Sequence, residues 1–272
     1  MIIIVPVSGG KDSQKCLALA LDSHPKTSIR AVHQWTGYDH PLTYAHMKYM
    51  ERHYGVKIEF TRNFNRWDNI FDFIRGAGYF PNNAARGCTK ELKQKPFAQW
   101  LLANKLTGAG VSQIWMGMRR EESRARNEKY AGLSPDDIFT LTDINPSAYP
   151  PKKFATVEMR LPIVDESVEQ VFSFLKKRGD RVNELYKKGH DRVGCYPCML
   201  SKREEWVRAM KDPVGRKHIS ELLKIEQEFK DNKNPRKLIR IHENRDVKFL
   251  YDHGRFPDKK KDDSAECGWC SI

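Results

Sequence analysis

The sequence is 272 residues long, enough for one large domain or for one domain with a smaller appendage. Hydrophobic residues make up 39% of it, the mean hydropathy is −0.69, and the chain has no apolar run of membrane-spanning length. The N-terminus also lacks the basic segment and cleavage site of a signal peptide, so we expect a cytoplasmic protein that does not enter a membrane. The net charge of +13 favours an anionic partner, either nucleic acid or nucleotide substrates that account for part of the excess.

A short apolar strand, a glycine turn and a helix open the chain. Residues 2–5 are a β-branched run typical of a strand buried on both faces. Residues 8–13 form the turn, and residues 16–21, rich in alanine and leucine, indicate the helix. Glycines let backbone N–H groups approach a phosphate, and the helix dipole favours negative charge there. An ordinary turn needs no lysine, aspartate and pair of serines, so we predict a phosphate site. Its candidate residues are Ser8, Gly9, Gly10, Lys11, Asp12 and Ser13.

Strand and helix patterns alternate after this opening. The predicted strands are 28–35, 57–61 and 113–118, and the predicted helices are 41–54 and 67–74. This alternation predicts an α/β fold, a Rossmann-like parallel sheet with helices on both faces and the nucleotide at the carboxyl ends of the strands. We assign this domain to residues 1–165 and a helical, cysteine-containing C-terminal region to residues 166–272. A polar stretch with four prolines, 134–153, is expected to be a surface loop or lid.

Four arginines and two glutamates lie at the end of the predicted strand 113–118 and just beyond it. These charges would be costly to bury unpaired. Across the sheet from the glycine turn, the arginines would be placed to hold phosphate or sulfonucleotide oxygens in bidentate fashion. The competing interpretation is the solvated start of a charged helix. We predict phosphate or substrate contacts from Gly117, Arg119, Ser123 and Arg124.

The chain has six cysteines, which in a cytoplasmic protein indicate metal or redox groups rather than disulfides. Cys195 and Cys198 form one CxxC pair, and Cys267 and Cys270 form a second near the end of the chain. This spacing suits two thiolates on one metal ion. Cys88 lies in a basic, glycine-preceded setting, as a ligand or low-pKa thiolate would, although lone cysteines are usually buried as small hydrophobes. One zinc ion held by both pairs, and reduced thiols without a metal, both stay open.

The residues of the glycine turn, SGGKDS, resemble the PP-loop of the N-type ATP pyrophosphatases, the adenine nucleotide alpha-hydrolase superfamily. Three other segments resemble motifs of its phosphoadenosine-phosphosulfate (PAPS) reductase-like branch: 117–126 (GxRxxES…R), 185–198 (LY..G…GC..C) and 32–55 (DTG…PET). In the last of these, Trp35 replaces the usual Asp and Leu42 the usual Glu. His33 in the same segment is a candidate contact to the base or ribose, against a structural role at a strand end.

The resemblance implies ATP and Mg²⁺ as cofactors, and it places Lys11, Asp12 and Arg119 in catalytic roles. Iron–sulfur members of the family imply a 4Fe-4S cluster, with Zn²⁺ as the alternative metal. The implied ligands are Cys88, Cys195, Cys198 and Cys270. The sequence around Cys267 resembles the Glu-Cys-Gly tail of the sulfonucleotide reductases, in which that cysteine is the nucleophile.

Three functions are compatible with these features. The first is a PP-loop ATP pyrophosphatase that cleaves ATP at the alpha phosphate to activate a substrate, in sulfur transfer with a sulfur donor or in nucleic-acid modification. The second is a PAPS or adenylyl-sulfate reductase that uses the C-terminal cysteine and thioredoxin. The third is a nucleic-acid-binding module with a regulatory nucleotide pocket. The intact SGGKDS favours the first, because reductases do not need to expel pyrophosphate; Cys267 and Cys88 favour the second.

Overall fold

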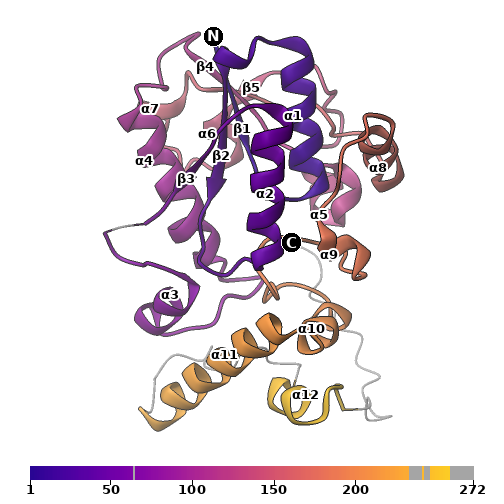
Figure 1. The fold of residues 1–272 in the computed structure, drawn as a ribbon. Coiled ribbons are helices and arrows are strands. Elements are labelled where there is room, and N and C mark those ends of the chain that lie inside the picture. Colours follow the sequence, from indigo (N-terminus) through magenta and orange to yellow (C-terminus); the bar gives the residue numbers. More distant parts are fainter. Residues whose placement is uncertain (64, 233–240, 242–245, 258–272) are drawn as a thin grey trace.

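A six-stranded sheet in the order β3-β2-β1-β4-β6-β5 lies at the centre of the computed structural model, which describes residues 1–63, 65–232, 241 and 246–257 (Figure 1). The strands are β1 (Ile2–Pro6), β2 (Ile29–Gln34), β3 (Ile58–Thr61), β4 (Ser112–Trp115), β5 (Phe139–Thr140) and β6 (Glu158–Arg160). All neighbouring pairs in this sheet are parallel except β5 and β6, which are antiparallel. The predicted α/β fold with a largely parallel sheet is confirmed.

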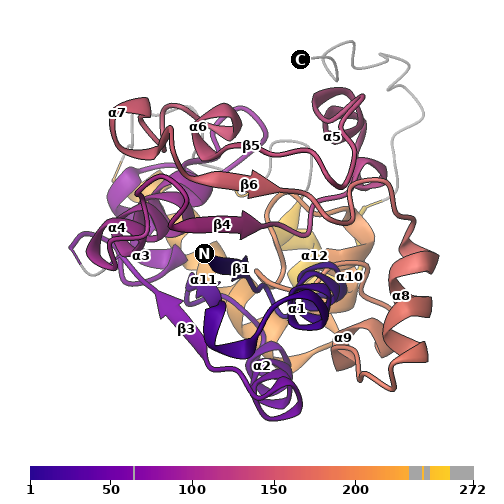
Figure 2. The ribbon, with the colours of Figure 1, turned by 90° about the horizontal axis from the view of Figure 1, so that it is seen from above.

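The central strand β1 is covered on both faces, as its continuous apolar sequence predicts. Ile3 and Val5 face one core cluster and Ile4 faces another, and all three are fully buried. The helices on the first face are α1 (Lys11–Ser23), α2 (Pro41–Tyr54) and α8 (Val168–Lys177) (Figure 2). Those on the second face are α4 (Lys95–Ala103), α6 (Leu141–Ile144) and α7 (Pro151–Phe154).

A further group of helices lies beyond the carboxyl ends of the strands (Figure 1). It consists of α3 (Ile70–Ala77), α10 (Arg203–Met210), α11 (Pro213–Asp231) and α12 (Val247–His253). The indole of Trp206 is fully buried in the shared core of these helices. Helix α3, from the N-terminal part, shares a core with α10, α11 and α12, and α8, from the C-terminal part, covers the sheet. Residues from both sides of the predicted boundary at residue 165 therefore pack together. The division into two domains stays a prediction. In the part of the chain that the structure describes, every helix is too short or too polar to cross a membrane.

Several local signals define the ends of the helices. Ser167 and Gln170 form a capping box at the start of α8, and Gly179 follows its end with a φ of +73°. The stretch 134–153, which the sequence predicts to be a surface loop or lid, contains β5, α6 and the start of α7. Its prolines do not prevent this, because Pro151 occupies the first turn of α7, where the missing N–H has no intrahelical partner.

The shorter elements connect these layers. They are α5 (Arg124–Lys129), α9 (Glu184–Lys187), two 3₁₀ turns (Lys26–Ser28 and Arg120–Glu122) and one π-helical segment (Thr89–Gln94).

Candidate functional site

The loop of residues 8–13 leaves β1 at its carboxyl end and leads into α1. The backbone N–H of Ser8 donates to Ser13 Oγ at 3.1 Å, and this hydroxyl donates to the Gly10 carbonyl at 3.0 Å. Gly9 has a φ of +73°, and a Cβ there would lie 2.6 Å from the Thr43 side chain. The two serines and Gly9 therefore hold a tight turn that α2 packs against, as a backbone phosphate cradle requires.

Lys11, the first residue of α1, points into a closed environment. Its side chain is only 7% exposed, and its ammonium lies 3.0 Å from Asp12 Oδ2. The same ammonium lies 5.6 Å from the ring centroid of Phe172 on α8 and 5.5 Å from that of Tyr186 on α9. The Tyr186 hydroxyl accepts a hydrogen bond from the Lys11 backbone N–H at 3.1 Å. Burial raises the pKa of this hydroxyl, so Tyr186 is neutral at physiological pH.

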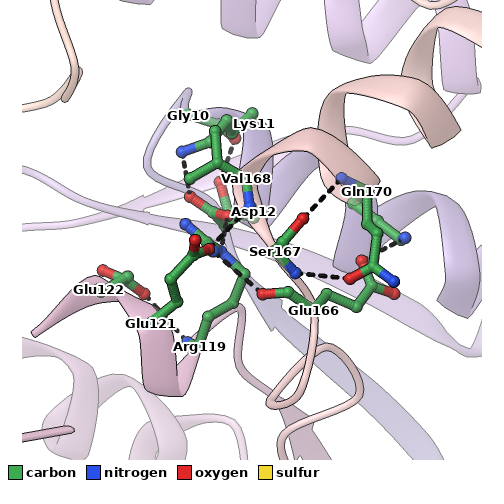
Figure 3. Close-up of polar contacts among 12 residues, drawn as sticks. Gly10, Lys11, Asp12, Arg119, Glu121, Glu122, Glu166, Ser167, Val168 and Gln170 are labelled. Atoms are coloured by element: carbon green, nitrogen blue, oxygen red, sulfur yellow. Dashed lines mark hydrogen bonds and ion pairs between the residues drawn. The ribbon is translucent and has the colours of Figure 1, made fainter. Parts of the chain in front are cut away.

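Arg119 reaches the same loop from the segment after β4 (Figure 3). It is 2% exposed; its Nε donates to Asp12 Oδ1 at 2.6 Å and its Nη1 to Glu121 Oε2 at 2.7 Å. Glu121 Oε2 also accepts the backbone N–H of Val168 at 2.8 Å, which ties the start of α8 to this network. Burial alone would lower the pKa of Arg119, but the Asp12 and Glu121 carboxylates outweigh it and raise the pKa. A buried cation is thus prepositioned beside the loop.

Gly117 lets the two loops approach. A Cβ at this position would lie 2.8 Å from the backbone carbonyl of Asp12, so any side chain would separate the segment after β4 from the start of α1.

Ser123 and Arg124 lie farther out than Arg119. Ser123 caps α5 through the Arg126 N–H at 3.3 Å, and Arg124 has a 79% exposed side chain that pairs with Glu128 at 2.8 Å. Both line a cavity of about 540 Å³ that also includes Glu121 and Glu166, next to the Arg119 network. Their predicted contacts with phosphate or substrate stay predictions.

Three of the predicted metal ligands are gathered around one lysine. Cys195, Cys198 and Cys88 all raise the pKa of Lys93, with Cys195 the strongest cause. Burial raises the pKa of the Cys195 thiol to about 12, although Lys93 opposes the shift. The described residues nevertheless hold no group of three or more His, Cys, Asp or Glu side chains placed to bind a metal ion.

The tail cysteines, Cys267 and Cys270, lie outside the described residues. The predicted four-cysteine metal centre and the predicted nucleophile therefore stay predictions.

The carboxyl end of β2 also contributes polar groups. His33 is 3% exposed; its Nδ1 donates to the Val7 carbonyl at 2.8 Å, and its Nε2 lies 3.5 Å from Asp39 Oδ2. Burial would raise the pKa of Asp39, but the neighbouring His33 and Lys93 lower it overall. The hydrogen bond from His33 to the backbone carbonyl of Val7, just before the loop, gives His33 a structural role. Its predicted contact to the base or ribose stays a prediction.

Several side chains of this site are absent from the sequence-based prediction. Tyr186, Phe172, Lys93 and Asp39 were not singled out, although Tyr186 lies inside the LY..G motif. That motif match was the one available signal, because the contact between Tyr186 and Lys11 joins residues 175 positions apart.

Residues 2–201 match the phosphoadenosine phosphosulfate reductase domain family. The chain is 27% identical over 247 residues to an uncharacterised 37.8 kDa protein from the gpa 5′ region of Escherichia phage 186, covering 75% of this chain and 69% of that protein. It is 29% identical over 153 residues to the adenosine 5′-phosphosulfate reductase of Allochromatium vinosum, covering 55% of this chain and 50% of that enzyme.

One solved structure illustrates the likeness in fold. The phosphate complex of the phosphoadenylyl-sulfate reductase from Candida auris superposes with a TM-score of 0.51 at 15% identity, over 73% of this chain and 83% of that one. At this identity the likeness concerns the fold alone. Since the chain spans half the length of the Allochromatium reductase, the match to that enzyme does not transfer its activity.

Proposed function

The chain belongs to the phosphoadenosine phosphosulfate reductase domain family, and we propose that it cleaves ATP at the alpha phosphate to activate a second substrate. The observation that carries the proposal is the convergence of Lys11 and Arg119 on Asp12, at the N-terminus of α1. Two cations, a glycine turn and a helix N-terminus at one point suit the phosphate chain of a nucleotide.

In the proposed reaction these residues stabilise the negative charge that develops on the leaving pyrophosphate. A nucleophile on the second substrate forms a bond to the alpha phosphorus, and the bond from that phosphorus to the oxygen bridging to the beta phosphate breaks. The leaving pyrophosphate takes the electron pair, and the amides of the loop, Lys11 and Arg119 face the charge that it gains. Arg119 needs little rearrangement, because its guanidinium already lies beside the loop. Lys11 and Asp12 keep the catalytic roles predicted from the sequence.

Mg²⁺ would neutralise the phosphate charge during this reaction. Asp12 and Glu121 supply the carboxylates beside the loop, and each is hydrogen-bonded to Arg119. This donor set fits a magnesium ion that takes most of its ligands from phosphates and water.

Incubation with ATP labelled at the alpha phosphate tests the proposal. We expect labelled AMP or adenylylated product together with pyrophosphate, and incorporation of labelled pyrophosphate into ATP only when the second substrate is present. Candidate acceptors are nucleic acids, which the charge of +13 favours, and sulfur acceptors. Formation of ADP alone, or no turnover with any acceptor, would contradict cleavage at the alpha phosphate.

The relative from Allochromatium supports a second candidate, reduction of an adenylyl sulfate. In that reaction a cysteine thiolate attacks the sulfur, the sulfur–oxygen bond to AMP breaks, and a dithiol of the thioredoxin class releases sulfite from the resulting thiosulfonate. Cys267 is the candidate nucleophile. Sulfite release that depends on an adenylyl sulfate and a dithiol, without ATP cleavage, would favour this candidate over the first.

A further inference from the structure

The first backbone amide of α1 already has a partner, and this partner comes from a distant segment. The Lys11 N–H donates to the Tyr186 hydroxyl at 3.1 Å, across 175 positions of sequence. The first four N–H groups of a helix have no intrahelical acceptor, so they are the groups that an anion would take. At this amide, the Tyr186 oxygen lies where a phosphate oxygen would accept the same hydrogen bond.

The space over the loop is also filled. A Cβ on Gly10 would lie 3.1 Å from the Tyr186 hydroxyl and 3.2 Å from Val193 Cγ2, so a methyl group hardly fits there. Phe172 contacts Tyr186 edge-to-face, with ring centroids 5.3 Å apart, and both rings cover the Lys11 ammonium. Tyr186, Phe172 and Val193 thus lie close over Gly10 and Lys11, so a phosphate chain bound at this amide would meet them.

We propose that the Tyr186 hydroxyl holds the place of a phosphate oxygen at the N-terminus of α1, and that the phosphate chain of the bound nucleotide displaces it. The inference rests on the proposed function for the identity of the ligand. An amide has a single hydrogen, so Lys11 N–H cannot make a full bond to Tyr186 and to phosphate together.

The displacement is confined to a short segment. Asn183, at the start of α9, is fully buried and donates to the Gly9 carbonyl at 3.1 Å and to Thr43 Oγ1 at 3.2 Å. These two bonds fix the start of α9 to the loop and to α2. The Tyr186 side chain therefore turns away while Asn183 keeps its bonds, and the opening exposes Lys11 to the ligand.

Inorganic pyrophosphate, ATP and adenosine are the probes, with binding measured by calorimetry for the full-length wild type and Tyr186→Phe. The variant removes the competing oxygen and keeps the ring. We expect pyrophosphate and ATP to bind about fivefold more tightly to it, the equivalent of one neutral hydrogen bond. Adenosine, which has no phosphate, should bind both proteins equally. Tyr149→Phe is the matched control, because Tyr149 is a buried tyrosine in the core on the other face of the sheet.

The outcomes separate this inference from the proposed function. Weaker pyrophosphate binding by Tyr186→Phe would mean that the hydroxyl contacts the ligand. An equal change in the affinities for adenosine and pyrophosphate would mean a general structural effect. Either result overturns the inference. If ATP is never cleaved but pyrophosphate binds more tightly to the variant, the proposed function fails and the inference stands. Tyr186→Leu, which removes both ring and hydroxyl, gives a second test if Tyr186→Phe does not fold, with the same expected discrimination between pyrophosphate and adenosine.

Discussion

Arg119 Nε and Asp12 Oδ1 lie 2.6 Å apart, in an ion pair that joins the loop after β4 to the loop after β1 (Figure 3). The Arg119 side chain is 2% exposed and the Asp12 side chain 19% exposed, so the pair is shielded from water on its cationic side. Asp12 also holds Lys11 at 3.0 Å, which means that one carboxylate positions both cations of the site. A phosphate chain would take over these cations from Asp12 without requiring new ones.

Lys11→Met should remove most of the ATP-dependent activity. The ammonium faces the leaving pyrophosphate in the proposed reaction, and loss of one preorganised charge contact of this kind costs about 10²–10³ in kcat. Stability should change little, because Asp12 keeps its bond to Arg119. Pyrophosphate exchange and urea unfolding measure the two effects. Lys177→Met, at an exposed position of α8, is the control; equal activity of the two variants would contradict the role of Lys11.

Arg119→Met should destabilise the fold, because it leaves the Asp12 and Glu121 carboxylates without their buried cation. We expect a loss of about 2–3 kcal/mol in the free energy of unfolding, below the usual range for a fully buried pair because both carboxylates are partly exposed. In a double-mutant cycle with Asp12→Asn, the double variant should lose less than the sum of the single variants. Additive losses in urea unfolding would show that the pair contributes nothing to stability.

The first four strands of the sheet and the glycine turn could be predicted from the sequence, because their signals are local, whereas β5 and β6 were not predicted. The β-branched run that forms β1 and the turn after it need no information about distant residues. The stretch 134–153 could not be predicted this way. Polar residues and prolines predict a loop, but Tyr149 and Phe154 are buried against the second face of the sheet and order the segment. Tertiary burial thus overrode a local composition signal.

The residues of the candidate site also fall into those that the sequence could predict and those that it could not. Lys11 and Arg119 could be predicted because each lies in a motif at the end of a strand. Tyr186 could not be placed beside Lys11, because the LY..G motif that contains it does not show which distant residue it contacts. Lys93 could not be predicted either, because the three cysteines whose charges raise its pKa, Cys88, Cys195 and Cys198, come from two distant segments.

His46 should make stability depend on pH. It is 7% exposed, its Nε2 donates to Gln14 Oε1 at 2.9 Å, and burial lowers its pKa from 6.5 to about 4. In the unfolded chain the imidazole takes up a proton below about pH 6.5, but in the folded chain only near pH 4. Stability is therefore lost as the pH falls through this window, by about 3 kcal/mol in all.

His46→Gln removes this proton uptake and should flatten the dependence. Urea unfolding of the wild type and the variant at pH 7 and pH 4.5 measures the difference. The wild type should lose about 2 kcal/mol more than the variant between these two pH values. Parallel losses would mean that the imidazole is charged in the folded chain.

We predict a metal centre that needs Cys270, near the end of the chain, in addition to Cys88, Cys195 and Cys198. Protein purified without oxygen should contain iron and acid-labile sulfide. Cys195→Ala, Cys198→Ala, Cys88→Ala and Cys270→Ala should each lose most of both, because the predicted cluster takes all four thiolates as ligands. Cys267→Ala should keep them, since Cys267 is the predicted nucleophile. Cys16→Ala is the control, because Cys16 is buried in α1 against the sheet.

Metal analysis distinguishes the alternatives in the same samples. Zinc at one equivalent, lost in the same variants, would replace iron–sulfur with a zinc site. Full iron content in both Cys195→Ala and Cys198→Ala would exclude the CxxC pair as ligands. Wild-type protein without any metal would leave the thiols around Lys93 as reduced, buried groups, in keeping with the raised pKa of Cys195.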